Sequence, residues 1–390
     1  MKSKKSLKII ISLYLSIPIF IYILIYAKEI KSGGHIWKTG DWLINYEAGL
    51  IRRGLTGQLY IYLSEISNIN ILLISFLFQS FIYISIFIIV LFFYFKKERD
   101  YLWLTLLLSP AFIIIFPFYD LYGGFRKEIL GFLSFSILLI AIDKKSIILL
   151  ITSTFLYTIA VFSHELNCFL LPFFVYVIFS QNTASRNKKT SLSLFVKNKE
   201  EIFWASLFFI ISLIALAISF YHSGSKEDGE IICQSLLNIG LKEHICDGSL
   251  LWIGRDTTFG YNLVTALFLK GEYDFYIFYI ILSLAPFLFF RWTYQKKIYL
   301  LAIISISFLL PLFIVAIDWG RWIHIFITMF TLLALFESSK NPDLIQPIIK
   351  TNPTIKVLLI FSFLAWKMEH CCNPSFKIPI FNIIKNILSF

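Results

Sequence analysis

Long apolar runs, separated by short polar segments, dominate the chain. A run of roughly 20 apolar residues spans a hydrocarbon core of ~30 Å as an α-helix. The pattern therefore predicts an all-α, polytopic membrane protein with about 11 transmembrane helices. The expected helices cover residues 9–27, 70–95, 101–118, 129–142, 146–162, 166–180, 202–221, 274–290, 298–317, 323–336 and 357–368.

The N-terminus begins with MKSKKSLK and continues into the apolar run 9–27, which has the basic and hydrophobic regions of a signal peptide. No small-x-small cleavage site follows it, and the run is long enough to span a membrane. We therefore expect a retained first helix with its basic end in the cytoplasm.

Charge provides a test of the topology that follows, because Lys and Arg in short loops prefer the cytoplasmic side. The segments expected inside hold 20 Lys and Arg against 7 acidic residues, while the segments expected outside hold 14 against 17. The formal net charge of +11 is thus explained by sidedness and argues against nucleic acid as a partner. The inside segments are the N-terminal one, 96–100, 143–145, 181–201, 291–297 and 337–356.

Composition excludes a soluble globular domain, since 58% of residues are hydrophobic, 15% are charged and the mean hydropathy is +0.77. We expect one membrane domain over residues 1–390. Two outer loops are long, 28–69 and 222–273.

Cysteines fit this sidedness. Cys233 and Cys246 fall in one outer loop, where an oxidising periplasm would permit a disulfide, although buried free thiols explain them as well. Cys371 and Cys372 also fall outside. The cysteines lack the spacing of metal ligands, so we expect no zinc site.

The first outer loop contains the most informative segment, GDWLINYEAGLIRRGLTGQL, at residues 40–59. In a chain with few charges, it gathers Asp41, Glu47, Arg52 and Arg53. We expect an amphipathic interfacial helix here, anchored at headgroup depth by aromatic residues. Those residues are Trp42 and Tyr46.

Two interpretations of this loop compete. In the functional one, a carboxylate acts as general base while Arg52 and Arg53 bind a phosphate through their planar guanidinium groups. In the alternative, the arginines of a surface helix only bind lipid headgroups. Gly54 and Gly57 favour a close backbone approach over a plain surface helix.

Four further groups of ionisable residues fall at the expected outer ends of helices. Such groups at the membrane boundary are costly and usually functional, and here they lie at one depth although they are far apart in sequence. A local explanation also exists: Asp318 and Arg321 would neutralise each other at i and i+3, and His164 beside Glu165 would cap a helix end. The candidate binding residues are Asp120, Arg126, Lys127, His164, Glu165, Arg255, Asp318, Arg321 and His324.

The layout resembles bacterial enzymes of surface-polysaccharide assembly. The first outer loop with Asp41, the IRRGLTG run and the DWGRW turn are similar to O-antigen and capsular repeat-unit polymerases (Wzy type) and to lipid-linked-sugar glycosyltransferases of the GT-C architecture. The resemblance implies a catalytic base in the first outer loop, Asp41 first and Glu47 second. The chain departs from many GT-C enzymes because this loop has no adjacent acidic pair.

The resemblance also implies partners. They are a polyprenyl-diphosphate-linked glycan, membrane lipid and other polysaccharide-assembly proteins. Arg52, Arg53 and Arg126 would meet the pyrophosphate, no organic cofactor is implied, and a divalent metal ion is optional.

A transporter or flippase is the main alternative, because charges within a membrane also mark substrate paths. It predicts charges near the bilayer midplane and two matching halves. The apolar runs contain almost no charge and the halves do not match. An acyl-transferring protein, the third possibility, would be expected to have one dominant histidine within the membrane.

Overall fold

The computed structural model describes residues 2–99, 101–180, 199–293, 295–348 and 352–371. These residues are mostly helical, as the apolar runs predict. Within them, the strands are β1 (Phe290–Trp292) and β2 (Ile345–Pro347), which pair antiparallel with Arg291 opposite Gln346.

Five helices of the described chain are long and apolar enough to cross a membrane. Their apolar side chains suit a lipid environment. A helix is favoured there because all of its backbone polar groups bond within the segment. The prediction of an all-α membrane protein is confirmed at this level. The five are α1 (Lys2–Ser32), α3 (Ile71–Phe95), α9 (Lys199–Tyr221), α14 (Gln295–Val315) and α15 (Trp319–Lys340).

Shorter helices match most of the other expected runs. Residues 166–180 begin as the 3-10 turn η2 (Glu165–Leu170) and continue as α8. The matching helices are α6 (Glu128–Lys144), α7 (Ile147–Ser163), α8 (Leu171–Ser180), α13 (Asp274–Leu288) and α16 (Pro353–Leu364).

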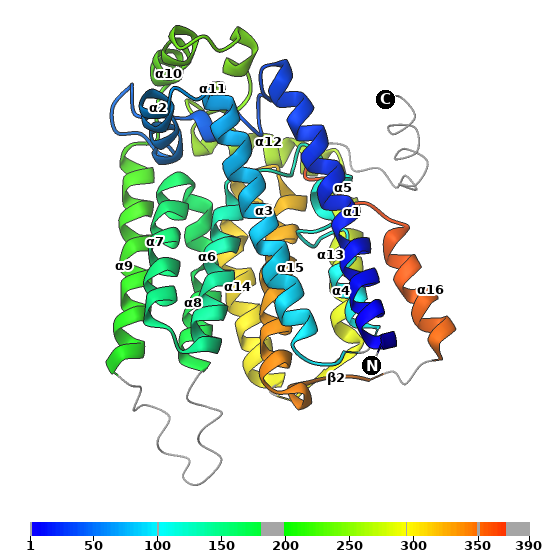
Figure 1. Cartoon of the computed structure of the whole chain (residues 1–390). Helices are drawn as coiled ribbons and strands as arrows, with labels where there is room; N and C mark the ends of the chain where they lie inside the picture. Colours follow the sequence, from blue (N-terminus) through cyan, green and yellow to red (C-terminus); the bar gives the residue numbers. More distant parts are fainter. Residues whose placement is uncertain (1, 100, 181–198, 294, 349–351, 372–390) are drawn as a thin grey trace.

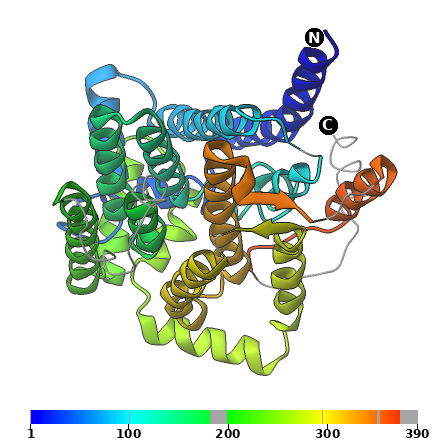
Figure 2. The same cartoon turned by 90° about the horizontal axis from the view of Figure 1, so that it is seen from below.

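Helix α15 lies at the centre, contacting α3, α6, α13 and α14 (Figures 1 and 2). In its most apolar 18-residue window, 94% of the residues are buried, compared with 22% in the corresponding windows of α1 and α9 at the periphery. The upper end in Figure 1, with α2 and α10–α12, is called the cap end here. The opposite end, with β2 and the N-terminus, is called the hairpin end.

The expected helix over 101–118 is wrong. The segment forms only α4 (Trp103–Leu107) and α5 (Phe116–Tyr119), joined by irregular backbone that contains Pro110. Proline lacks an amide hydrogen and clashes with the preceding helical turn. The residues between α4 and α5 are buried in protein, the condition under which irregular backbone is tolerated beside a membrane core.

The expected amphipathic helix is displaced along the chain. Residues 40–54 form the short 3-10 turn η1 (Asp41–Leu43) and irregular backbone, and the helix α2 (Leu55–Ser67) begins only after the arginine pair. Trp42 is fully buried, so its role as a headgroup anchor is wrong. Its ring instead packs against Tyr60 of α2.

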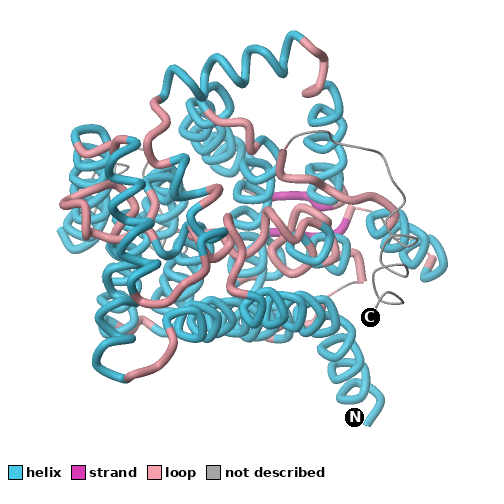
Figure 3. Tube along the Cα trace, turned by 90° about the horizontal axis from the view of Figure 1, so that it is seen from above, coloured by secondary structure: helices cyan, strands magenta, loops and turns pink. Residues whose placement is uncertain are grey.

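The loop 222–273 folds into short helices and turns at the cap end. Figure 3 shows the molecule from this end. It contains α10 (Lys226–Asn238), the 3-10 turn η4 (Glu243–Cys246), α11 (Ser249–Trp252) and α12 (Thr257–Leu269). Ser225 and Asp228 form a capping box that starts α10. Cys233 and Cys246 form a disulfide between α10 and η4, which decides between the two interpretations of these thiols.

Candidate functional site

Trp42 brings the first loop to the start of α6. Its indole Nε1–H donates to the Phe125 carbonyl at 2.8 Å, and the Phe125 amide donates to the Tyr83 hydroxyl at 3.0 Å. Asp41 precedes the tryptophan and Arg126 follows the phenylalanine. One buried hydrogen bond therefore fixes an acidic residue beside a basic one, although 85 positions separate them in the sequence.

Asp41 is the least satisfied carboxylate of the site. It is 1% exposed, and neither carboxylate oxygen accepts a hydrogen bond from the described residues. The nearest ion-pair contact is Arg126 Nε at 3.8 Å from Oδ2. A buried charge without hydrogen bonds is costly, so it needs compensation from neighbouring charges.

Electrostatics keep Asp41 ionised nonetheless. Burial alone would raise the pKa of Asp41, but Lys127 and Arg126 outweigh it and hold the pKa below its ordinary value. Burial lowers the pKa of Lys127 to about 8, although Asp41 acts in the opposite direction. Lys127 Nζ donates to the Arg53 carbonyl at 2.8 Å.

Arg53 forms a bidentate pair with Glu165, in which Nε lies 2.9 Å from Oε2 and NH2 contacts Oε1. Its φ of +68° is in the left-handed region, which costs a non-glycine residue about 1–2 kcal/mol. Arg52 reaches the same glutamate at 4.0 Å and donates to the Ile253 carbonyl at 3.2 Å. The arginine pair thus joins α7 and α8 to the cap.

Gly54 and Gly57 allow the close approach that the sequence predicts. A Cβ on Gly54 would lie 2.3 Å from the Tyr46 ring, and one on Gly57 would lie 2.1 Å from the Ile44 carbonyl oxygen. These distances leave no room for a methyl group. The two glycines therefore allow α2 to pack closely against the loop that carries Asp41.

Arg321, in the first turn of α15, is buried between two acids. Its Nε and NH2 bind both oxygens of Glu128 at 3.0 and 2.8 Å, and its NH1 binds Asp318 at 2.5 Å. The expected pair between Asp318 and Arg321 is confirmed, with Glu128 as an additional partner. Arg126 interacts electrostatically with Arg321, Asp41 and Asp318, so this group adjoins Asp41.

Asp120 pairs with a residue that the sequence analysis did not single out. Its Oδ2 lies 2.7 Å from His370 Nδ1 and also accepts from the His370 amide. Burial opposes the charged forms, but Asp120 raises the pKa of His370 and His370 lowers the pKa of Asp120. Each residue therefore stabilises the charged form of the other.

The structure brings most of the predicted residues into one ionic cluster at the cap end, from five chain segments. We define the ionic cluster as Asp41, Arg52, Arg53, Asp120, Arg126, Lys127, Glu128, Glu165, Asp318, Arg321 and His370.

Four predicted residues lie at its margin or outside it. His164 caps η2 by accepting from the Leu166 amide, as the local explanation expects. Glu47 is exposed and takes no part in the ion pairs of the described residues. The exposed Arg255 guanidinium lies 4.5 Å from the Phe259 ring centre, and only the Arg255 carbonyl meets Arg52.

His324 lies deeper along α15. Its Nδ1 hydrogen-bonds the Ala111 carbonyl at 2.8 Å, and its ring stacks on Phe116 at 4.1 Å. It therefore satisfies a backbone group of the broken segment 101–118.

The sequence analysis missed Glu128 and His370. Glu128 directly follows Lys127, so the run FYDLYGGFRKE at residues 118–128 contained its signal. His370 directly precedes the two neighbouring cysteines after the last expected helix. Its link to Asp120 crosses 250 positions, which no local spacing reveals.

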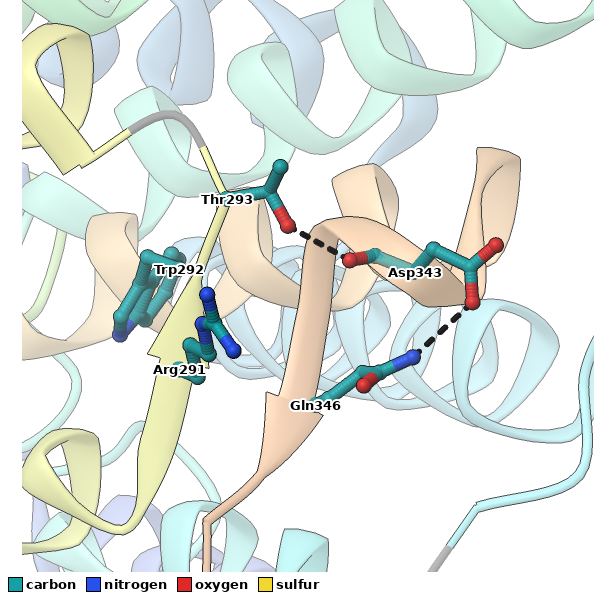
Figure 4. Close-up of a pocket in the computed structure, with 5 residues that line it drawn as sticks. All are labelled: Arg291, Trp292, Thr293, Asp343 and Gln346. Atoms are coloured by element: carbon teal, nitrogen blue, oxygen red, sulfur yellow. Dashed lines mark hydrogen bonds between the residues drawn. The ribbon is translucent and has the colours of Figure 1, made fainter.

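A polar pocket lies at the hairpin end, far from the ionic cluster (Figure 4). The Thr293 hydroxyl donates to the Asp343 carbonyl at 2.7 Å, and Gln346 donates to the Asp343 carboxylate at 2.9 Å. Arg291 and Trp292 complete the lining. The lining's carboxylate is already bonded, so we place the candidate chemistry at the ionic cluster.

Comparison with known proteins identifies no relative: no family model, curated protein or solved structure matches the chain.

Proposed function

We propose that the chain is a multi-pass bacterial inner-membrane glycosyltransferase that acts on polyprenyl-diphosphate-linked glycans, as repeat-unit polymerases do. The proposal includes a cytoplasmic N-terminus, a GT-C-like layout with about 11 membrane passages, and the cap end facing outward. The segment 101–118 would be a passage with irregular backbone. The observation that carries the proposal is Asp41, a buried carboxylate that lacks hydrogen bonds and lies beside Arg126 and Lys127.

The missing hydrogen bonds of Asp41 suit a hydroxyl donor, and its two cationic neighbours suit a phosphate. In the proposed reaction, an acceptor sugar hydroxyl attacks the anomeric carbon of the donor glycan and a new C–O bond forms. The bond to the pyrophosphate oxygen breaks with its electron pair, and the hydroxyl proton passes to Asp41. The products are the longer glycan and a free polyprenyl diphosphate.

Binding of the anion would also activate the base. Arg126 and Lys127 keep the pKa of Asp41 low while no other anion is bound. A pyrophosphate that pairs with these cations would offset their effect, and burial would then raise the pKa of Asp41. The carboxylate becomes a stronger base only when substrate is present.

The test replaces Asp41 by Asn, which keeps the size of the side chain and one oxygen that can accept a hydrogen bond, but which cannot accept the proton. Turnover should fall by a factor on the order of 10² to 10⁴. In the source bacterium carrying only this variant, gel electrophoresis of surface glycan should show a single repeat unit where the parent shows a ladder. Immunoblotting of membranes checks that the protein level is unchanged.

Two variants serve as comparisons. Asp247→Asn removes an exposed carboxylate of the cap and should leave the ladder intact. Glu47→Gln tests the other candidate base, and loss of the ladder there but not in Asp41→Asn would transfer the role to Glu47. A transporter would instead give cells without surface glycan, single units included, and that outcome would contradict the proposal.

A further inference from the structure

A mixed group of potential metal ligands adjoins the ionic cluster at the start of α15. Asp318, His370 and Cys371 each offer one ligand atom, and these three atoms all lie within 4.8 Å of one another. Carboxylate, imidazole and thiolate are the donor types that bind zinc in proteins. The three side chains are only partly buried, so an ion has access to them.

The backbone around His370 is held in place. Its carbonyl accepts from the Gly320 amide at 3.0 Å, and its own amide donates to Asp120. A Cβ on Gly320 would lie 1.9 Å from the Glu369 carbonyl oxygen. The segment after α16 is therefore pressed against the first turn of α15, next to Asp318.

Asp120 orients the imidazole. It is 5% exposed, its Oδ1 accepts from the Tyr122 and Gly123 amides, and its Oδ2 bonds His370 Nδ1 at 2.7 Å. A carboxylate on one imidazole nitrogen directs the other nitrogen toward a metal, an arrangement that recurs behind metal-binding histidines. Here the nitrogen left for an ion is Nε2.

We propose that Asp318, His370 and Cys371 bind a divalent transition metal ion of the zinc class, with Asp120 as a positioning residue. Three protein ligands leave one coordination position open, as in reactive zinc sites. On binding, the ion takes the place of the Cys371 thiol proton, which passes to solvent, and it accepts the Nε2 lone pair of the neutral His370 ring, whose Nδ1–H stays bonded to Asp120. Arg321 occupies Asp318 Oδ2, which leaves Oδ1 for the ion.

The proposal departs from the expectation of no zinc, which rested on cysteine spacing. The ligands come from two segments about 50 positions apart, and only one of them is a cysteine. The inference does not depend on glycosyl transfer, because it concerns binding alone.

The experiment uses the full chain, purified in detergent with a tag that contains no histidine. Metal-depleted protein is mixed with equimolar zinc chloride and desalted, and elemental analysis should find one zinc per chain. Cobalt(II) in place of zinc should give the near-ultraviolet absorption of a thiolate–cobalt bond. Asp120→Asn should weaken zinc binding by about 10- to 100-fold without removing that absorption.

Matched variants test the ligand set, each first checked for unchanged elution on size-exclusion chromatography. Cys371→Ser should abolish the thiolate–cobalt absorption, and Cys372→Ser should retain it. His370→Gln should lose zinc, whereas the exposed His222→Gln should not. Substoichiometric zinc in the parent, or a thiolate–cobalt absorption that survives Cys371→Ser, would overturn the proposal.

Discussion

At the residue scale, the site is a set of acidic and basic side chains, and one of its carboxylates differs from the others in its hydrogen bonding. Arginine forks or backbone amides satisfy Glu165, Glu128 and Asp120 at hydrogen-bonding distance. Among the described residues, the cationic nitrogen nearest to Asp41 is Arg126 Nε at 3.8 Å, and none donates a hydrogen bond to its carboxylate. The first three hold chain segments together, and the proposed function assigns Asp41 and its neighbour Lys127 to the substrate.

The pKa of Lys127 predicts that the proposed activity depends on pH. Its pKa of about 8 lies below the usual lysine value, so rising pH removes the charge that would bind an anion. In membrane vesicles, kcat/KM for glycosyl transfer should fall as the pH increases through about 8. Lys127→Arg should abolish the decline, since arginine stays charged.

His370 also loses its proton with rising pH, so the profile is repeated with His370→Gln as the control. Asp41 adds no step in this range because its pKa lies below its ordinary value. A decline that persists unchanged in Lys127→Arg would assign it to another group.

At the element scale, two glycine contacts position the site. Gly57 lets α2 lie against Ile44, three residues after Asp41, and Gly320 lets the segment at His370 lie against α15. Neither contact needs a special φ angle, because each depends on the absence of a side chain. The bend of 40–54 differs, because Gly49 and Arg53 within it have positive φ angles.

Gly57→Ala tests this packing. The added methyl group would lie 2.1 Å from the Ile44 carbonyl oxygen and must displace α2 or the loop. We expect a loss of about 1–3 kcal/mol in the free energy of unfolding, together with weaker activity. Thermal unfolding in detergent measures the first, with Glu65→Ala on the exposed face of α2 as the control. Equal melting temperatures for the two variants would contradict the close contact.

At the scale of the whole molecule, buried ionisable groups lie at helix ends: His164 directly follows α7, Glu128 begins α6 and Arg321 is in the first turn of α15. The central helix α15 carries Arg321 in its first turn and is apolar through its middle. A path for a charged solute predicts charge at mid-depth. This distribution suits chemistry at one membrane surface better than transport.

The proposed orientation predicts a labelling pattern. In a Cys371→Ser, Cys372→Ser background, a membrane-impermeant maleimide should label Ser32→Cys in intact spheroplasts, because Ser32 is exposed at the cap end. Gln346→Cys, exposed at the hairpin end, should react only after the membrane is opened. The reverse pattern would invert the topology and place the ionic cluster in the cytoplasm.

The sequence by itself determined that this is a helical membrane protein, and it located most of the helices. A segment that spans lipid must be long, apolar and internally hydrogen-bonded. The local sequences of α3, α9 and α14 show the length and apolar character directly. It also indicated most members of the ionic cluster, because charges are conspicuous in an apolar chain.

Only the tertiary structure decided how those residues are used. Trp42 and its bond to the Phe125 carbonyl set Asp41 beside Arg126, and Asp120 meets His370 across 250 positions. The break in 101–118 depends on burial by neighbouring helices and on His324. Several buried charges meet partners that are distant in sequence, so no local pattern can show that the described residues give Asp41 no hydrogen bond.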